Sequence, residues 1–180
     1  LPTTELNYTG SGIAITATGF NVLSDFFLTG NANATGGIYY GPETIVSLET
    51  RRIRVKDFSK IGAYGMRVNG VLESIWDTIR VQSNYDNLII DGAGNTTLSF
   101  RNAYFSHAAR YGTYITGLRG SNFIDGIWES NFGIGLYLYG VDVHDVDFYN
   151  AWTEGNNLGT VVPADVPEIQ LSGSAGNLSN

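Results

Sequence analysis

A short segment ending in glycine repeats four times along the chain at almost regular intervals. The copies are Gly65–Gly70, Asn87–Gly92, Gly112–Gly117 and Gly135–Gly140, and their last glycines are 22, 25 and 23 residues apart. Within each copy a mostly apolar set alternates with a more polar set, as in a β-strand with one side in a core. The apolar pairs are Met66/Val68, Leu88/Ile90, Thr113/Ile115 and Leu136/Leu138. A repeat of this length favours a solenoid of stacked units.

A second series of apolar residues follows a similar interval. It consists of Ile53, Ile75, Phe100, Phe123 and Val143, at spacings of 22, 25, 23 and 20 residues. From the second coil on, each member is followed two residues later by an Asp or Asn, namely Asp77, Asn102, Asp125 and Asp145. We expect the first series in the core and the second at corners, because Asp and Asn side chains bond their own backbone at turns.

The interval excludes the other common repeat architectures. A helical repeat needs a 3.6-residue period, which no long segment shows, and a propeller blade is about 40 residues long. We therefore predict an all-β fold, a right-handed single-stranded parallel β-helix of about six or seven coils. Weaker coils at Gly12–Gly19 and Gly36–Gly41 contribute to that number. We expect the β-helix to cover residues 1–160 and residues 161–180 to be an irregular loop, lid or subunit contact.

The composition agrees with this architecture and argues against several classes of partner. Charged residues make up 15% of the chain and Gly 23 of its 180 residues, which suits short strands and tight turns. The net charge of −7 argues against nucleic acid, whose phosphates are bound by Lys and Arg. No apolar run is long enough for membrane insertion. With no Cys and two His 37 residues apart, we expect no metal site and no cofactor.

Two segments near the end of the repeat resemble a known family. Residues 148–156 (FYNAWTEGN) and 127–138 (IWESNFGIGLYL) are similar to the coils of pectate-lyase-like β-helices, and most similar to bacteriophage tailspike and tail-fibre proteins. The resemblance covers roughly residues 12–157. It implies a homotrimer in a virion tail or outside the cell that binds, and often cleaves, bacterial surface polysaccharide. The chain has neither a polygalacturonase-type aspartate pair with Gly-His-Gly nor a recognisable pectate-lyase calcium cluster.

Two acidic residues are candidates for catalysis. Counting the alternation predicts that Glu129 and Asp147 point outward on adjacent coils, with backbones roughly 8 Å apart. Their carboxyl groups then reach the separation of about 5 to 9.5 Å found in glycosidases, where one group protonates the glycosidic oxygen and the other activates water or attacks the sugar. The alternative is that both are solvated surface acids.

Tyrosines are the main candidates for binding. Tyr114, Tyr137 and Tyr139, with Tyr40 on an earlier coil, are predicted to point outward from the first strand of a coil. Sugar rings stack on flat aromatic side chains while their hydroxyls bond polar neighbours, here Arg67. Tyrosine is also enriched where subunits meet, so this face fits a trimer interface equally well.

Three further aromatic residues complete the carbohydrate-binding candidates. Tyr104 and Tyr149 flank the two acids, and Trp152 lies near the end of the repeat. Trp128 falls on the inward side and is expected in the core. Two functions follow: a tailspike-like segment that recognises and possibly depolymerises surface polysaccharide, or a non-catalytic structural or adhesive β-helix shaft.

Overall fold

The computed structural model describes residues 4–19, 22–158 and 169–172. All strand pairs among these residues are parallel. The strands are β1 (Thr4–Asn7), β2 (Ile13–Ala17), β3 (Val22–Thr29), β4 (Gly36–Tyr40), β5 (Ile45–Val46), β6 (Glu49–Lys56), β7 (Tyr64–Val68), β8 (Val71–Gln82), β9 (Asp86–Ile90), β10 (Thr96–Arg101), β11 (Tyr104–Ser106), β12 (Tyr111–Ile124), β13 (Ile127–Glu129), β14 (Ile134–Tyr149), β15 (Trp152–Glu154) and β16 (Ile169–Ser172). The predicted fold class is confirmed, because the strands stack as an all-β parallel solenoid of about six turns.

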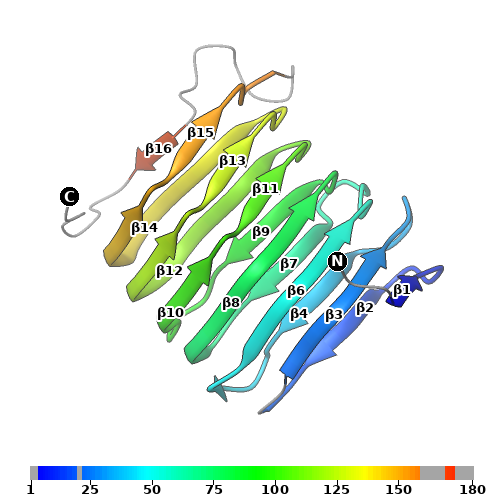
Figure 1. The fold of residues 1–180 in the computed structure, drawn as a ribbon, viewed down its shortest axis with the longest axis horizontal. Helices are drawn as coiled ribbons and strands as arrows, with labels where there is room; N and C mark the ends of the chain where they lie inside the picture. The colour runs from blue at the N-terminus through cyan, green and yellow to red at the C-terminus, as the bar shows by residue number, and fades with distance from the viewer. Residues whose placement is uncertain (1–3, 20–21, 159–168, 173–180) are drawn as a thin grey trace.

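Each turn of the solenoid has three faces, which we name A, B and C in chain order. Face A contains β2, β4, β7, β9, the first parts of β12 and β14, and β16. Face B contains the first parts of β3 and β6, the middle of β8, β10, and the second parts of β12 and β14. Face C contains β1, the last parts of β3, β6 and β8, and then β11, β13 and β15. Figure 1 shows these strands as a regular stack from the blue N-terminal coils to the orange β15.

The end of the stack includes part of the segment that was expected to be irregular. Strand β16 continues face A beside β14. The rest of 161–180, and the expected boundary at residue 160, lie outside the described residues.

The corners of the solenoid are formed mainly by residues other than glycine in the left-handed conformation. Between faces B and C, one residue per coil has a φ of 49° to 62°. These residues are Asp25, Arg52, Thr78, Asn102, Asp125 and Asn150, at spacings of 27, 26, 24, 23 and 25 residues. Of the expected Asp/Asn series, Asn102 and Asp125 stand at this corner, and Asp145, with a φ of 54°, stands at another corner. Asp77 does not, because its neighbour Thr78 takes the left-handed position. Coil length varies by up to four residues.

The repeated glycines serve two different purposes. Gly70, Gly92 and Gly140 have positive φ, as expected for corner glycines. Gly117 does not, and a Cβ there would lie 2.1 Å from the carbonyl oxygen of Gly92. Glycine at this position allows two coils to approach closely.

The core is filled by the alternating apolar residues and by a stack of aromatic rings. The predicted inward pairs on face A are buried. On face B, Trp76, Phe100, Phe123 and Phe148 stack at centroid distances of 4.6, 4.7 and 5.1 Å. Such stacks add to the apolar burial that each coil gains from its neighbours.

The register of this stack corrects the second apolar series. Trp76, not Ile75, pairs with Phe100, and the partner of Phe123 on β14 is Phe148, not Val143. Ile75 points outward and is 37% exposed. Tyr40, expected outward, is also buried, because its hydroxyl is held by Thr50 Oγ1 at 3.1 Å and its ring meets Trp76 edge-on. Trp128 is buried as predicted, and its Nε1 donates to Thr113 Oγ1 at 2.8 Å.

A network of buried asparagines lines the corner after face C. Asn84, Asn131 and Asn156 each accept a backbone N–H from the preceding coil, at Phe58, Ala108 and Asn131. Their amide nitrogens donate to backbone carbonyls of the preceding coil, at Val55, Phe105 and Trp128. These bonds satisfy buried polar groups that would otherwise be unpaired.

Candidate functional site

The structure distributes the predicted site residues over all three faces. Tyr114, Tyr137, Tyr139 and Arg67 belong to the strands or strand ends of face A. Tyr104, Glu129 and Trp152 lie on face C. Asp147 and Tyr149 lie on face B. The predicted aromatic residues therefore form one group on face A and one on face C, with Tyr149 on face B.

Face C carries an outward ladder of arginine and apolar side chains, which we name the Arg–aromatic column. Strand register aligns Phe27 with Arg54, Arg54 with Arg80, Arg80 with Tyr104, Tyr104 with Ile127, and Ile127 with Trp152. The ladder is a straight row because parallel strands stack equivalent positions about 4.8 Å apart. At its C-terminal end, Trp152 is 58% exposed.

A polar column runs beside the Arg–aromatic column. Register aligns Gln82, Ser106, Glu129 and Glu154 on successive coils, and Ser106 is the buried member. The Tyr104 hydroxyl donates to Glu129 Oε2 at 2.9 Å, and Trp152 Nε1 donates to Glu154 Oε2 at 3.1 Å. Burial raises the pKa of Tyr104, which keeps its hydroxyl protonated as a donor. The two columns together present ring surfaces beside fixed hydrogen-bonding groups.

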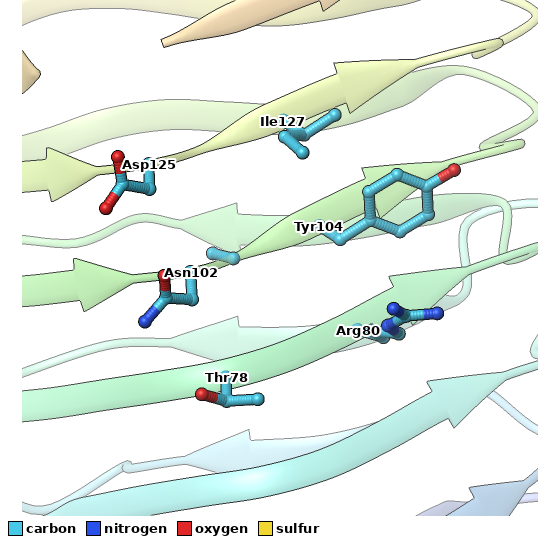
Figure 2. Close-up of a pocket in the computed structure, with 7 residues that line it drawn as sticks. Thr78, Arg80, Asn102, Tyr104, Asp125 and Ile127 are labelled. Carbon is cyan, nitrogen blue, oxygen red and sulfur yellow. The ribbon is translucent and has the colours of Figure 1, made fainter. Parts of the chain in front are cut away.

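A groove follows the Arg–aromatic column on the side of the corner between faces B and C. It has a volume of about 300 Å³ and is lined by Thr78, Arg80, Asn102, Ala103, Tyr104, Asp125 and Ile127. Figure 2 shows Arg80, Tyr104 and Ile127 along one side, and Thr78, Asn102 and Asp125 along the other. The volume is at the lower end of the range for small-molecule sites, about 300 to 1,000 Å³. Both walls are therefore built from equivalent positions on consecutive coils.

Register also determines where the predicted catalytic pair lies. Glu129 is aligned with Ser106 and Glu154, whereas Asp147 is aligned with Asn122 on face B. The alignment that placed Glu129 and Asp147 in neighbouring columns of one face is thus wrong. The carboxylate beside Glu129 in its own column is Glu154, which sequence reasoning missed because the coil after Glu129 was counted too short.

Face B has a groove of its own. It encloses about 270 Å³ and is lined by polar residues that include Glu73, Thr97, Arg101 and Asn122. Asp147 follows Asn122 in the ladder. Among the described residues that line this groove, none is aromatic.

Face A carries the tyrosine cluster, which we define as Tyr111, Tyr114, Tyr137 and Tyr139. The rings contact one another at centroid distances of 5.1 to 6.0 Å. Burial raises the pKa values of Tyr111 and Tyr114. Tyr111 was not predicted, although it lies next to the repeated Gly112–Gly117 segment.

The arginines around the tyrosine cluster are paired with carboxylates. Arg67 Nε and Nη2 donate to Asp91 at 3.0 and 2.6 Å, and Arg110 Nε and Nη2 donate to Asp86 at 2.9 and 2.5 Å. Burial raises the pKa of Asp86, and the Arg110 guanidinium opposes this shift. The predicted ligand-binding Arg67 is therefore engaged within the protein.

The part of the chain that the structure describes contains neither a metal-binding cluster nor a membrane-spanning helix. In residues 4–19, 22–158 and 169–172, no group of three or more His, Asp or Glu side chains could hold a metal ion. No helix in these same residues is long and apolar enough to cross a membrane.

No known protein family, no curated protein and no solved structure matches this chain.

Proposed function

We propose that this β-helix recognises bacterial surface polysaccharide along face C, as a segment of a phage tailspike-like or tail-fibre-like protein on a virion tail or outside the cell. A parallel β-helix offers a long, straight face on which equivalent positions recur at about 4.8 Å. A linear polymer can contact several such positions at once, so that many weak contacts add up.

The observation that carries the proposal is the pair of columns on face C. Tyr104, Ile127 and Trp152 supply apolar surface for sugar rings, and Glu129 and Glu154 supply acceptors for sugar hydroxyls. The groove beside Tyr104 gives this face a concave stretch, as carbohydrate and small-molecule sites require.

Tryptophan fluorescence provides a selective test. Trp76 and Trp128 are both 0% exposed, whereas Trp152 is 58% exposed on the proposed binding face. Acrylamide should therefore quench Trp152 preferentially. A panel of capsular and lipopolysaccharide oligosaccharides would be screened for protection of Trp152 from quenching, and Kd would be measured by calorimetry.

Matched variants separate the two tyrosine-bearing faces. Tyr104→Ala should weaken binding by about tenfold or more, since an aromatic contact is worth about 0.5 to 1.5 kcal/mol beyond its buried area. Tyr137→Ala on face A should leave Kd unchanged. Loss of binding in the Tyr137 variant alone would move the site to face A, and no protection of Trp152 by any glycan would contradict the proposal.

Cleavage is a separate question from binding. Glu129 and Asp147 remain the predicted catalytic pair, and Glu154 is the alternative partner that strand register offers to Glu129. If the protein depolymerises a bound glycan, replacing a catalytic carboxylate by its amide should lower the rate by about a hundredfold or more while binding survives. Full activity in Glu129→Gln and Asp147→Asn would dismiss that pair.

The second candidate function is a structural or adhesive shaft. The tyrosine cluster favours it, because face A combines contacting rings with arginines already paired to Asp86 and Asp91. Such a face fits burial against other subunits of a homotrimer. In that case face A would be covered in the trimer, and mutation of Tyr137 or Tyr139 would change the oligomeric state and leave glycan binding intact.

A further inference from the structure

Two arginines stand directly beside each other in the Arg–aromatic column. Arg54 of β6 and Arg80 of β8 are aligned in register, so their backbones lie about 4.8 Å apart. Like charges at directly opposite positions of neighbouring strands destabilise a sheet. The pair thus imposes an electrostatic cost on the fold.

No carboxylate of the described residues relieves this cost. Arg51, Arg52, Arg67, Arg110 and Arg119 each form an ion pair with an Asp or Glu. Neither Arg54 nor Arg80 takes part in any ion pair within residues 4–19, 22–158 and 169–172. Arg101 likewise forms no ion pair among these residues, so the distinguishing feature of Arg54 and Arg80 is that two unpaired arginines stand side by side.

Aromatic rings, not carboxylates, hold the two guanidinium groups. Arg54 Cζ lies 6.0 Å from the ring centroid of Phe27, and Arg80 Cζ lies 5.6 Å from that of Tyr104. Contacts over a ring face orient a guanidinium and leave its charge uncompensated. Arg54 Nε is buried and has no hydrogen-bond partner in the described residues. Arg54 is partly exposed and Arg80 is exposed, so an external acceptor can approach the outer nitrogens of the two guanidinium groups.

We propose that Arg54 and Arg80 together bind an anionic group on the polysaccharide, so that the ligand of face C is an acidic glycan. This inference rests on the proposed function and names the class of its ligand. Planar guanidinium groups bind carboxylate and phosphate groups in a bidentate manner. The anionic group, whether a uronate or sialate carboxylate or a phosphate substituent, lies against the two arginines.

The rest of the Arg–aromatic column indicates how the bound glycan lies along face C. Tyr104 follows Arg80 by one coil and Trp152 follows it by three, a span of about 14 Å at 4.8 Å per coil. The acidic sugar of the glycan therefore lies nearer the N-terminal end of face C, and the sugars next to it stack on the rings that lead towards Trp152.

The test compares acidic oligosaccharides with neutral counterparts of the same backbone. Uronate-containing, sialate-containing and phosphorylated oligosaccharides are paired with their carboxyl-reduced or dephosphorylated forms, and protection of Trp152 from acrylamide reports binding. We expect at least one acidic member to bind tenfold or more tightly than its neutral form. Its affinity should fall as salt is raised from about 50 to 500 mM, because salt screens exposed charges. The pair that shows the difference identifies the anionic group.

Substitution of the arginines completes the test. The double variant Arg54→Gln with Arg80→Gln should lose the preference for the acidic form and keep the affinity for the neutral form. It should unfold at the same or a higher urea concentration, since a like-charge pair is removed. Arg119→Gln is the control, because Arg119 is exposed like Arg80, carries the same charge and is paired with Asp142. This control should bind as the wild type does.

The possible failures are distinguishable. Equal affinity for acidic and neutral forms, or an unchanged preference in the double variant, would overturn the role of the arginines while leaving polysaccharide binding intact. Dissociation of an oligomer in the double variant would overturn it in favour of an acidic partner surface. If no glycan of either kind protected Trp152, the proposed function itself would fail.

Discussion

Replacement of Asn131 by alanine should destabilise the solenoid strongly, although it removes only one small polar side chain. Asn131 is fully buried at the corner after face C. Its Oδ1 accepts the backbone N–H of Ala108 at 2.9 Å, and its Nδ2 donates to the Phe105 carbonyl at 3.2 Å and to Asn156 Oδ1 at 2.7 Å. One side chain thus joins three consecutive coils.

The expected magnitude follows from these bonds. Leaving the buried Ala108 N–H without a partner costs about 1 to 3 kcal/mol, and each of the two donated bonds contributes about 0.5 to 1.5 kcal/mol net. The loss in free energy of unfolding should therefore be roughly 2 to 5 kcal/mol, allowing for water that enters the vacated space. Asn131→Asp should not rescue it, because an acidic side chain keeps the acceptor but turns an oxygen towards the Phe105 carbonyl.

Urea denaturation at 25 °C and amide hydrogen exchange would measure the effect. Solenoids can unfold in parts, so exchange at the Ala108 amide gives the local stability directly. Asn69→Ala is the control, since Asn69 is only half-buried and makes a single long bond of 3.4 Å to Asp91. It should cost less than about 1 kcal/mol. Undiminished protection of the Ala108 amide in Asn131→Ala would refute the reasoning.

Four other outcomes are expected. Leu138→Ala should cost about 2 to 5 kcal/mol in urea denaturation, because Leu138 is 1% exposed and aligned with Ile115; an equal cost for its outward neighbour Tyr137→Ala would contradict the alternation. The Asp25 carboxyl should titrate by NMR with a pKa of about 2 instead of 3.8, because Arg52 hydrogen-bonds the ionised form, and Arg52→Gln should return the pKa of Asp25 towards 3.8. The contribution of the Asp25–Arg52 pair to stability is therefore present above about pH 4 and is lost as the pH falls towards 2. Thr78→Gly should be neutral or stabilising by up to about 1 kcal/mol, since a β-branched residue is strained at a φ of 54°. Light scattering at micromolar concentration should give a homotrimer, and a stable monomer would count against the family resemblance.

Sequence reasoning predicted the fold because both of its signals are local. The two-residue alternation along a strand and the interval between copies can be counted directly, and they identified the inward residues of face A. Both signals are strongest around the repeated glycines, where a corner needs positive φ or two backbones approach closely.

The register of faces B and C could not be counted in the same way. The inward residues of β14 include Val143 and Phe148, which both suit the core, and each has an equivalent on β12. Aligning Phe123 with Val143 instead of Phe148 shifted the count by five residues. That shift placed Asp147 in the wrong column and hid the alignment of Glu129 with Glu154.

The residues at the corners explain why the sequence does not reveal this five-residue shift in register. A turn is usually recognised by Gly, Pro, Asn or Asp. Here Arg52, Glu73 and Thr78 occupy left-handed positions with φ of 50°, 48° and 54°. Such residues give no turn signal in a sequence, because neighbouring coils, not their own preference, impose the conformation.

Whether face A or face C is the better candidate for ligand binding depends on which arginines are paired with carboxylates. A single sequence does not reveal this pairing. Arg54, Arg67 and Arg80 all stand at alternating outward positions and look equivalent in the sequence. In the structure Arg67 is aligned with Ile89 and reaches Asp91, two residues further along that strand, whereas Arg54 is aligned with Arg80. Aromatic content is similar on both faces, so it does not separate a binding face from a subunit contact. We propose the uncompensated charge on face C as the feature that separates them, because adjacent unpaired arginines impose a cost on the fold that a bound anion would offset.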